Sequence, residues 1–150
     1  TGAVKRPELI KEIARSFGSQ AVVVSLEVKH ISKDNWEIYI DNGREKTGLN
    51  ALDWAKKVED LGAGEILITS VDRDGTGKGY EEDFITKVMK SVTIPVIAAG
   101  GAKTPLDIIS IIQKAKVDAI AVASMLHYDN FSVADIKKTL VQANITTALH

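Results

Sequence analysis

The stretch Leu67 to Tyr80 reads LITSVDRDGTGKGY and decides how the rest of the chain is interpreted. It begins within an apolar run, residues 65–70, whose length and branched side chains favour a strand buried on both faces, as in a parallel sheet. Residues 72–79 then contain two carboxylates, two cations and three glycines. Loops that leave parallel strands are free to be polar, so this pattern indicates a functional loop, with a plain acidic turn as the alternative.

The composition is that of a globular chain of about one domain, with 150 residues, 45% of them hydrophobic, and a formal net charge of −1. The sequence contains neither a secretory leader pattern nor an apolar run long enough for a membrane span, which predicts a cytoplasmic protein. Zero cysteines exclude a disulfide framework, and the near-neutral charge argues against nucleic-acid binding. The three histidines lack a ligand-like spacing, so no metal or other cofactor is expected.

Helical and strand patterns alternate along the chain. Apolar runs predict strands at about 20–28, 65–71, 95–99 and 119–124, and helical periodicity with capping residues predicts helices at 7–17, 50–61, 82–92, 104–114 and 132–143. Residues 61–70 and 115–124 align position by position, 54 residues apart, which is typical of a repeat architecture. Residues 31–48 interrupt the alternation. Their period-two pattern and the Asn42-Gly43 turn predict an inserted β-hairpin.

The pattern predicts an α/β fold: a parallel (βα)4 half of a TIM-type (β/α)8 barrel with a hairpin after the first strand. We expect one domain over residues 1–150, with a leading helix in 1–18 and four βα units in 20–150. An open doubly wound sheet is the alternative. Half a barrel leaves two strand edges unpaired and its inner face open, so we expect another half-barrel or a second copy to cover them. The start at Thr1 rather than Met leaves open that the chain belongs to a longer protein.

Two other strand ends carry signals for ligand binding. Gly100 and Gly101 precede a predicted helix, where close backbone approach and the helix dipole suit a phosphate group, and Ser124 ends the neighbouring strand. A side chain at Gly101 is expected to fill the space that the anion needs. Glu27 ends the first strand as Asp72 ends the second, and such a carboxylate pair can divide acid and base roles. Taken alone, Glu27 is better read as a surface group near Lys29.

Four segments resemble the cyclase (synthase) subunits of imidazole glycerol phosphate synthases: FGSQAVVVSLEVK, KTGLNALDWAKKVEDLGAGEILITSVDRDGTGKGYEEDFI, IPVIAAGGA and VDAIAVASMLHY. The likeness covers nearly the whole chain and matches the C-terminal half of that family's eight-stranded barrel. It implies an ammonia-dependent enzyme of histidine biosynthesis, a glutaminase partner that supplies the ammonia, and a bisphosphorylated ribotide substrate that is converted into imidazole glycerol phosphate.

By the same resemblance, Asp74 and Glu27 occupy the positions of catalytic carboxylates, and Glu65 matches a gate where ammonia enters. The positions of the substrate and phosphate site are matched by Thr69, Ser70, Gly75, Gly100, Gly101, Ala123 and Ser124. The chain departs from the family at Glu27, where the family has aspartate, and at Lys103, where the family has glycine. The general acid/base aspartate of the family's first strand lies outside the chain, so residues 1–150 alone are expected to be incomplete for catalysis.

These departures leave two alternatives. The chain is also similar to paralogous synthase subunits that act with a glutaminase in surface-sugar biosynthesis. The second alternative is a non-catalytic half-barrel that only associates with partners.

Overall fold

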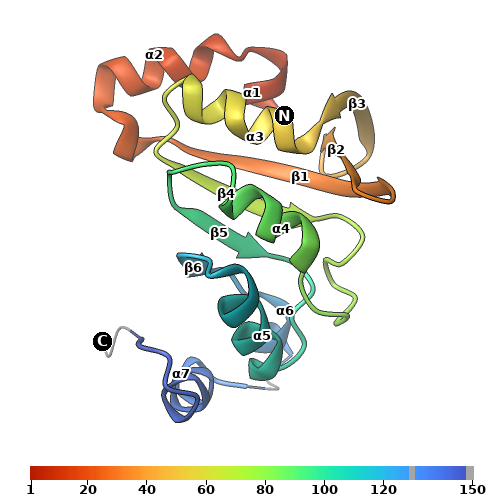
Figure 1. The fold of residues 1–150 in the computed structure, drawn as a ribbon, viewed down its shortest axis with the longest axis vertical. Helices are drawn as coiled ribbons and strands as arrows, with labels where there is room; N and C mark the ends of the chain where they lie inside the picture. Colours follow the sequence, from red (N-terminus) through yellow and green to blue (C-terminus); the bar gives the residue numbers. More distant parts are fainter. Residues whose placement is uncertain (129–130, 148–150) are drawn as a thin grey trace.

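In the computed structural model, which describes residues 1–128 and 131–147, a six-stranded sheet lies beneath a layer of helices (Figure 1). The strands are β1 (Val23–Ser32), β2 (Asn35–Ile40), β3 (Glu45–Asn50), β4 (Glu65–Ser70), β5 (Val96–Ala99) and β6 (Ala119–Ile120). The α-helices are α1 (Gly2–Lys5), α2 (Glu8–Phe17), α3 (Ala51–Asp60), α4 (Glu82–Met89), α5 (Pro105–Ala115), α6 (Ser124–His127) and α7 (Val133–Gln142), and a 3-10 turn, η1, spans Ser19–Ala21. Their order in the sheet is β3-β2-β1-β4-β5-β6.

Four of these strands, β1, β4, β5 and β6, are parallel and follow one another in chain order. Each crossover carries a helix, and α3, α4 and α5 lie over the same side of the sheet (Figure 1). The strand order never reverses, as it would in a doubly wound sheet. The predicted α/β class is therefore confirmed, and the arrangement is that of a partial (β/α)8 barrel.

The inserted hairpin is also confirmed, but β1 itself takes part in it. β1 continues to Ser32, beyond the predicted end at 28, and pairs antiparallel with β2 from Glu27 onward. The turn between β2 and β3 contains Asn42 and Gly43, both at positive φ, as the Asn-Gly signal predicts. One strand thus joins the parallel barrel sheet to an antiparallel ribbon.

Other element boundaries also differ from the prediction. The strand predicted at 119–124 is β6, which covers only Ala119–Ile120. After it, the chain makes one more sheet hydrogen bond, from Ala121 N–H to the Ala98 carbonyl, and then enters α6 at Ser124. The helix predicted at 7–17 is confirmed as α2, but a separate short helix, α1, precedes it and ends before Arg6, since the residue before a proline avoids helical geometry. The helix that starts at Glu82 ends at Met89, short of the predicted residue 92.

Burial of the central strands alternates, so the prediction that they are buried on both faces is wrong for this chain. Val24, Leu26, Ile66 and Ile68 point into the helix layer and are at most 5% exposed. The opposite face carries Val23, which is 51% exposed, and partly exposed apolar side chains on β4 and β5. The helix layer therefore forms the only large core within the described residues, and the other face of the sheet is open.

Glu59, at the end of α3, ties that helix to the segment that leads into β5. One of its carboxylate oxygens accepts hydrogen bonds from Thr93 N–H at 2.7 Å, Thr93 Oγ1 at 2.6 Å and Ile94 N–H at 3.2 Å. Burial acts to raise the pKa of Glu59, but these three hydrogen bonds outweigh it and hold the pKa below its usual value. The contact joins one βα unit to the next at the end of the sheet away from the polar loops.

We expect Glu59→Ala to lower the free energy of unfolding by about 1–2 kcal/mol at neutral pH, because the Thr93 donors lose their acceptor. Since the pKa of Glu59 is lowered on folding, its contribution is complete above the unfolded-state value and disappears as the pH falls through the folded-state value. Urea denaturation at pH 7 and near pH 3 measures both effects. Asp60→Ala, at the exposed neighbouring residue, is the control. An equal loss at both pH values would contradict the prediction.

Candidate functional site

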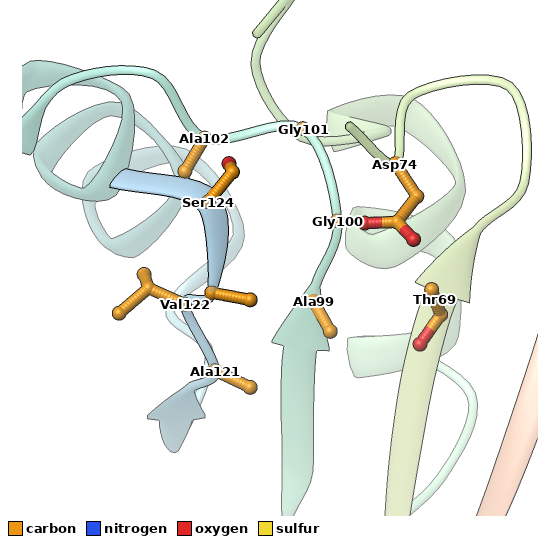
Figure 2. A pocket seen from close by; sticks show the side chains of 10 residues that line it. Thr69, Asp74, Ala99, Gly100, Gly101, Ala102, Ala121, Val122 and Ser124 are labelled. Atoms are coloured by element: carbon orange, nitrogen blue, oxygen red, sulfur yellow. The ribbon is translucent and has the colours of Figure 1, made fainter. Parts of the chain in front are cut away.

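A cavity of about 230 Å³ lies at the carboxyl ends of β4, β5 and β6 (Figure 2). It is bounded by the strand ends and by the loops that follow them. Its lining residues are Thr69, Asp74, Ala99, Gly100, Gly101, Ala102, Ala121, Val122, Ala123 and Ser124. Of the residues expected at the site, it thus brings together Thr69, Asp74, Gly100, Gly101, Ala123 and Ser124.

The floor of the cavity follows from strand register. Thr69 pairs with Ala99, and Ala99 lies beside Ala121, the residue after the end of β6, so all three project from the open face of the sheet at one level. Figure 2 shows these three side chains below the loops. Two alanines in this row leave room that larger side chains would fill. The open face is therefore hollow where the strands end.

The β4–α4 loop is folded by its own polar groups. The N–H groups of Arg73 and Asp74 donate to the Ser70 carbonyl, and Thr76 donates to the Arg73 carbonyl through both its N–H and its hydroxyl. Arg73 closes the loop, because its guanidinium donates to the Lys78 carbonyl at 3.1 Å and pairs with the buried Glu81 at 3.4 Å. The Asp74 side chain consequently reaches toward Gly100 over the cavity (Figure 2).

This loop is joined to the β5–α5 loop at Gly101. Gly79 N–H donates to the Gly101 carbonyl at 2.8 Å, and a Cβ on Gly101 would stand 2.2 Å from the Gly79 oxygen and 2.9 Å from Arg73 Cβ. The expectation that a side chain at Gly101 would occupy the anion's space stays a prediction, because the structure shows only that such a side chain meets the neighbouring loop. Such a side chain would push the two loops apart, so Gly101→Val tests loop packing before it tests anion binding.

Backbone donors gather at the loops around the cavity. Within residues 1–128 and 131–147, the N–H groups of Gly101, Ala102 and Ser124 donate no hydrogen bond to the protein. α5 begins just beyond, at Pro105, and Thr104 and Asp107 form a complete capping box there. Unpaired N–H groups from two adjacent loops near a helix N-terminus can hold an anion.

Four of the expected site residues lie outside this cavity. Ser70 is 2% exposed and points into the helix layer, because it alternates with Thr69 along β4. Gly75 lines a smaller neighbouring cavity, and Glu65 starts β4 at the opposite end of the strand. Glu27 pairs with Thr69 on the open face, but its carboxylate accepts a hydrogen bond from Gly43 N–H of the hairpin turn at 3.2 Å.

Four residues that line the cavity were not among the predicted site residues: Ala99, Ala102, Ala121 and Val122. The period-two alternation that places Thr69 on the open face could have identified Ala99 and Ala121, since each belongs to the same row. Ala102 and Val122 carry no such signal, because they follow the regular part of their strands.

Among the described residues there is neither a metal-binding cluster nor a membrane-spanning helix. Residues 1–128 and 131–147 contain no cluster of three histidine or acidic side chains arranged to hold a metal ion. In the same part of the chain, no helix has the length and apolar character required to cross a membrane.

The matching family model and the similar curated proteins point to the same family. The family model described as "Histidine biosynthesis protein" matches residues 1–132. The chain is 44% identical over 149 residues to imidazole glycerol phosphate synthase subunit HisF of Bacillus cereus (strain Q1), covering 99% of this chain and 59% of that protein. It is 45% identical over 146 residues to the HisF subunit of Alkaliphilus metalliredigens (strain QYMF), covering 97% of this chain and 58% of that protein. The chain thus spans about three-fifths of the length of these curated relatives, and it belongs to the histidine biosynthesis protein family.

Proposed function

We propose that this chain supplies the carboxyl-terminal part of a synthase subunit that forms imidazole glycerol phosphate from a bisphosphorylated ribotide and ammonia. The proposal rests on the cavity at the carboxyl ends of β4, β5 and β6. The Asp74 carboxylate and the backbone N–H donors of Gly101 and Ser124 line this same cavity. The family membership and the HisF names of the relatives support the same reaction. Those names do not favour the surface-sugar alternative.

In this proposal each group has a distinct task. The unpaired N–H groups of the β5–α5 and β6–α6 loops hold one phosphate of the substrate, which fixes the position of the reacting part. Asp74, on the other side of Gly100, then takes or returns a proton at that part of the substrate. Thr69 lies on the cavity floor and donates or accepts a hydrogen bond through its hydroxyl.

Glu27, Glu65 and the partners enter as further parts of the proposal. Glu27 sits beside Thr69 on the open face, so a turn of its side chain away from Gly43 would bring a second carboxylate toward the cavity. Glu65 begins β4 at the end away from the polar loops. In this proposal, ammonia from a glutaminase partner enters there and passes along the open face. Ser70 and Gly75 would act by shaping the β4–α4 loop. A single domain over residues 1–150 and a cytoplasmic location remain predictions.

We expect an ammonium salt and the ribotide to yield imidazole glycerol phosphate when residues 1–150 are joined to the other two-fifths of a HisF-like chain. The same residues prepared alone should give no turnover, since the acid/base aspartate and the second phosphate site that the resemblance implies lie outside them. Chromatographic detection of the product measures both. Nucleotide-linked sugars serve as competing substrates, and amidation of a sugar without ribotide turnover would refute the proposal.

A further inference from the structure

A second, smaller cavity adjoins the candidate site and has a lysine in its wall. It measures about 170 Å³ and shares Ala102 and Ser124 with the larger cavity. Its walls include Gly75 and Gly77 of the β4–α4 loop, Lys103 of the β5–α5 loop and the exposed Tyr128 after α6. The two spaces therefore meet at the loops that carry the unpaired N–H groups.

Lys103 is exposed, and its side chain lies along the β4–α4 loop. Its backbone N–H donates to the Asp107 carboxylate at 3.0 Å, and its side-chain carbons lie against Gly77, where a Cβ would stand 3.3 Å from Lys103 Cβ and Cδ. Within the described residues its ammonium group has no hydrogen bond, ion pair or ring contact. The ammonium group is therefore available to a ligand anion where the two cavities meet.

We propose that Lys103 is a specificity-determining residue that binds the phosphate monoester held by the Gly101 and Ser124 backbone. This inference rests on the proposed function, because it assigns an extra contact to the phosphate of that site. The ammonium group is a compact point charge that strengthens hydrogen bonding to a dianion beyond what neutral N–H groups supply. The site thus favours a doubly charged phosphate monoester over a singly charged or neutral group of similar size.

The test compares the binding of inorganic phosphate by the protein and by three variants, with calorimetry for affinity and amide NMR shifts of Gly101 and Ser124 for location. Lys103→Met keeps the stem and the N–H bond to Asp107 but removes the charge, and should weaken binding about three- to tenfold at low salt. Lys103→Arg should retain most of the affinity. Lys78→Met removes a charge from the β4–α4 loop beside a different cavity and should bind as the parent does.

The difference between parent and Lys103→Met should shrink as salt is raised, because the lysine is exposed to solvent. Equal affinity of the parent and Lys103→Met, with amide shifts at Gly101 and Ser124 in both, would overturn this inference and leave the proposed function standing. An absence of phosphate binding by the parent itself would count against both. Equal weakening in Lys78→Met and Lys103→Met would also overturn the inference, since it would reflect net charge alone.

Discussion

Asp74→Asn is expected to lower kcat of imidazole glycerol phosphate formation by about 10²- to 10⁴-fold in a complete synthase subunit. The carboxylate of Asp74 lines the cavity beside Gly100, and an amide in its place can neither take up nor release a proton at working pH. The variant keeps nearly the same shape, and the loop is folded by backbone and Arg73 contacts that do not involve the Asp74 carboxylate. KM should therefore change much less than kcat.

Asp72→Asn is the matched control for that experiment. Asp72 lies two residues earlier, is also exposed, and uses its carboxylate to accept a hydrogen bond from His30 N–H at 2.8 Å, outside the cavity. An asparagine there keeps an acceptor oxygen, so most of the turnover should remain. Steady-state rates with an ammonium salt as the nitrogen source avoid any dependence on a glutaminase. If both variants lost activity equally, the Asp74 carboxylate would have no distinct role.

The fold was predictable from sequence because its signals are local. Asn50 caps α3 by accepting from the N–H groups of Leu52 and Asp53, and the Thr104 and Ser132 capping boxes mark α5 and α7 where the pattern expected them. The four apolar runs then give parallel strands in chain order. The extension of β1 to Ser32 was not visible, because residues 29–32 are polar or exposed and are held by pairing with β2.

The site was predictable only in part, for a geometric reason. Sequence patterns identify strand ends and polar loops, and these contain Asp74, Gly101 and Ser124. They do not give the direction of a side chain at a strand end, so adjacent residues Thr69 and Ser70 were grouped although one faces the cavity and the other the core. Contacts such as Gly79 N–H to the Gly101 carbonyl join segments more than 20 residues apart, and no local pattern encodes them.

Residues 1–150, prepared by themselves, are expected to associate at micromolar concentration. The open face displays the exposed Val23 near one end of β1 and, on the neighbouring strands β4 and β5, the partly exposed pair Leu67 and Ile97. Within the described residues, the outer edge of β6 is not paired with a strand, and neither is the edge of β1 away from β4 before its pairing with β2 begins at Glu27. Both features favour docking of a second half-barrel, either from another part of a longer chain or from a second copy.

The apolar gain on association and its entropic cost are of similar size. Burying several hundred square ångströms of apolar surface contributes on the order of 10 kcal/mol at about 25 cal/mol per Å². The loss of translational and rotational freedom opposes it by about 4–15 kcal/mol, so the apolar gain alone does not decide the outcome. New backbone hydrogen bonds along the free strand edges add to the gain, each by about 0.5–1.5 kcal/mol. Because these edge hydrogen bonds add to an apolar gain of similar size to the cost, we expect a dimer or larger assembly rather than the 16.2 kDa monomer.

Light scattering of a matched pair of variants locates the interface. Leu67→Lys places a charge on the open face and should shift the protein toward monomer, because the ammonium group would be desolvated on docking. Leu106→Lys makes the same change at a leucine of α5 that is 67% exposed, and should leave association unchanged. A parent protein that stays monomeric at every concentration, without precipitation, would show that the open face needs no cover. Association abolished only by Leu106→Lys would place the interface on the helix layer instead.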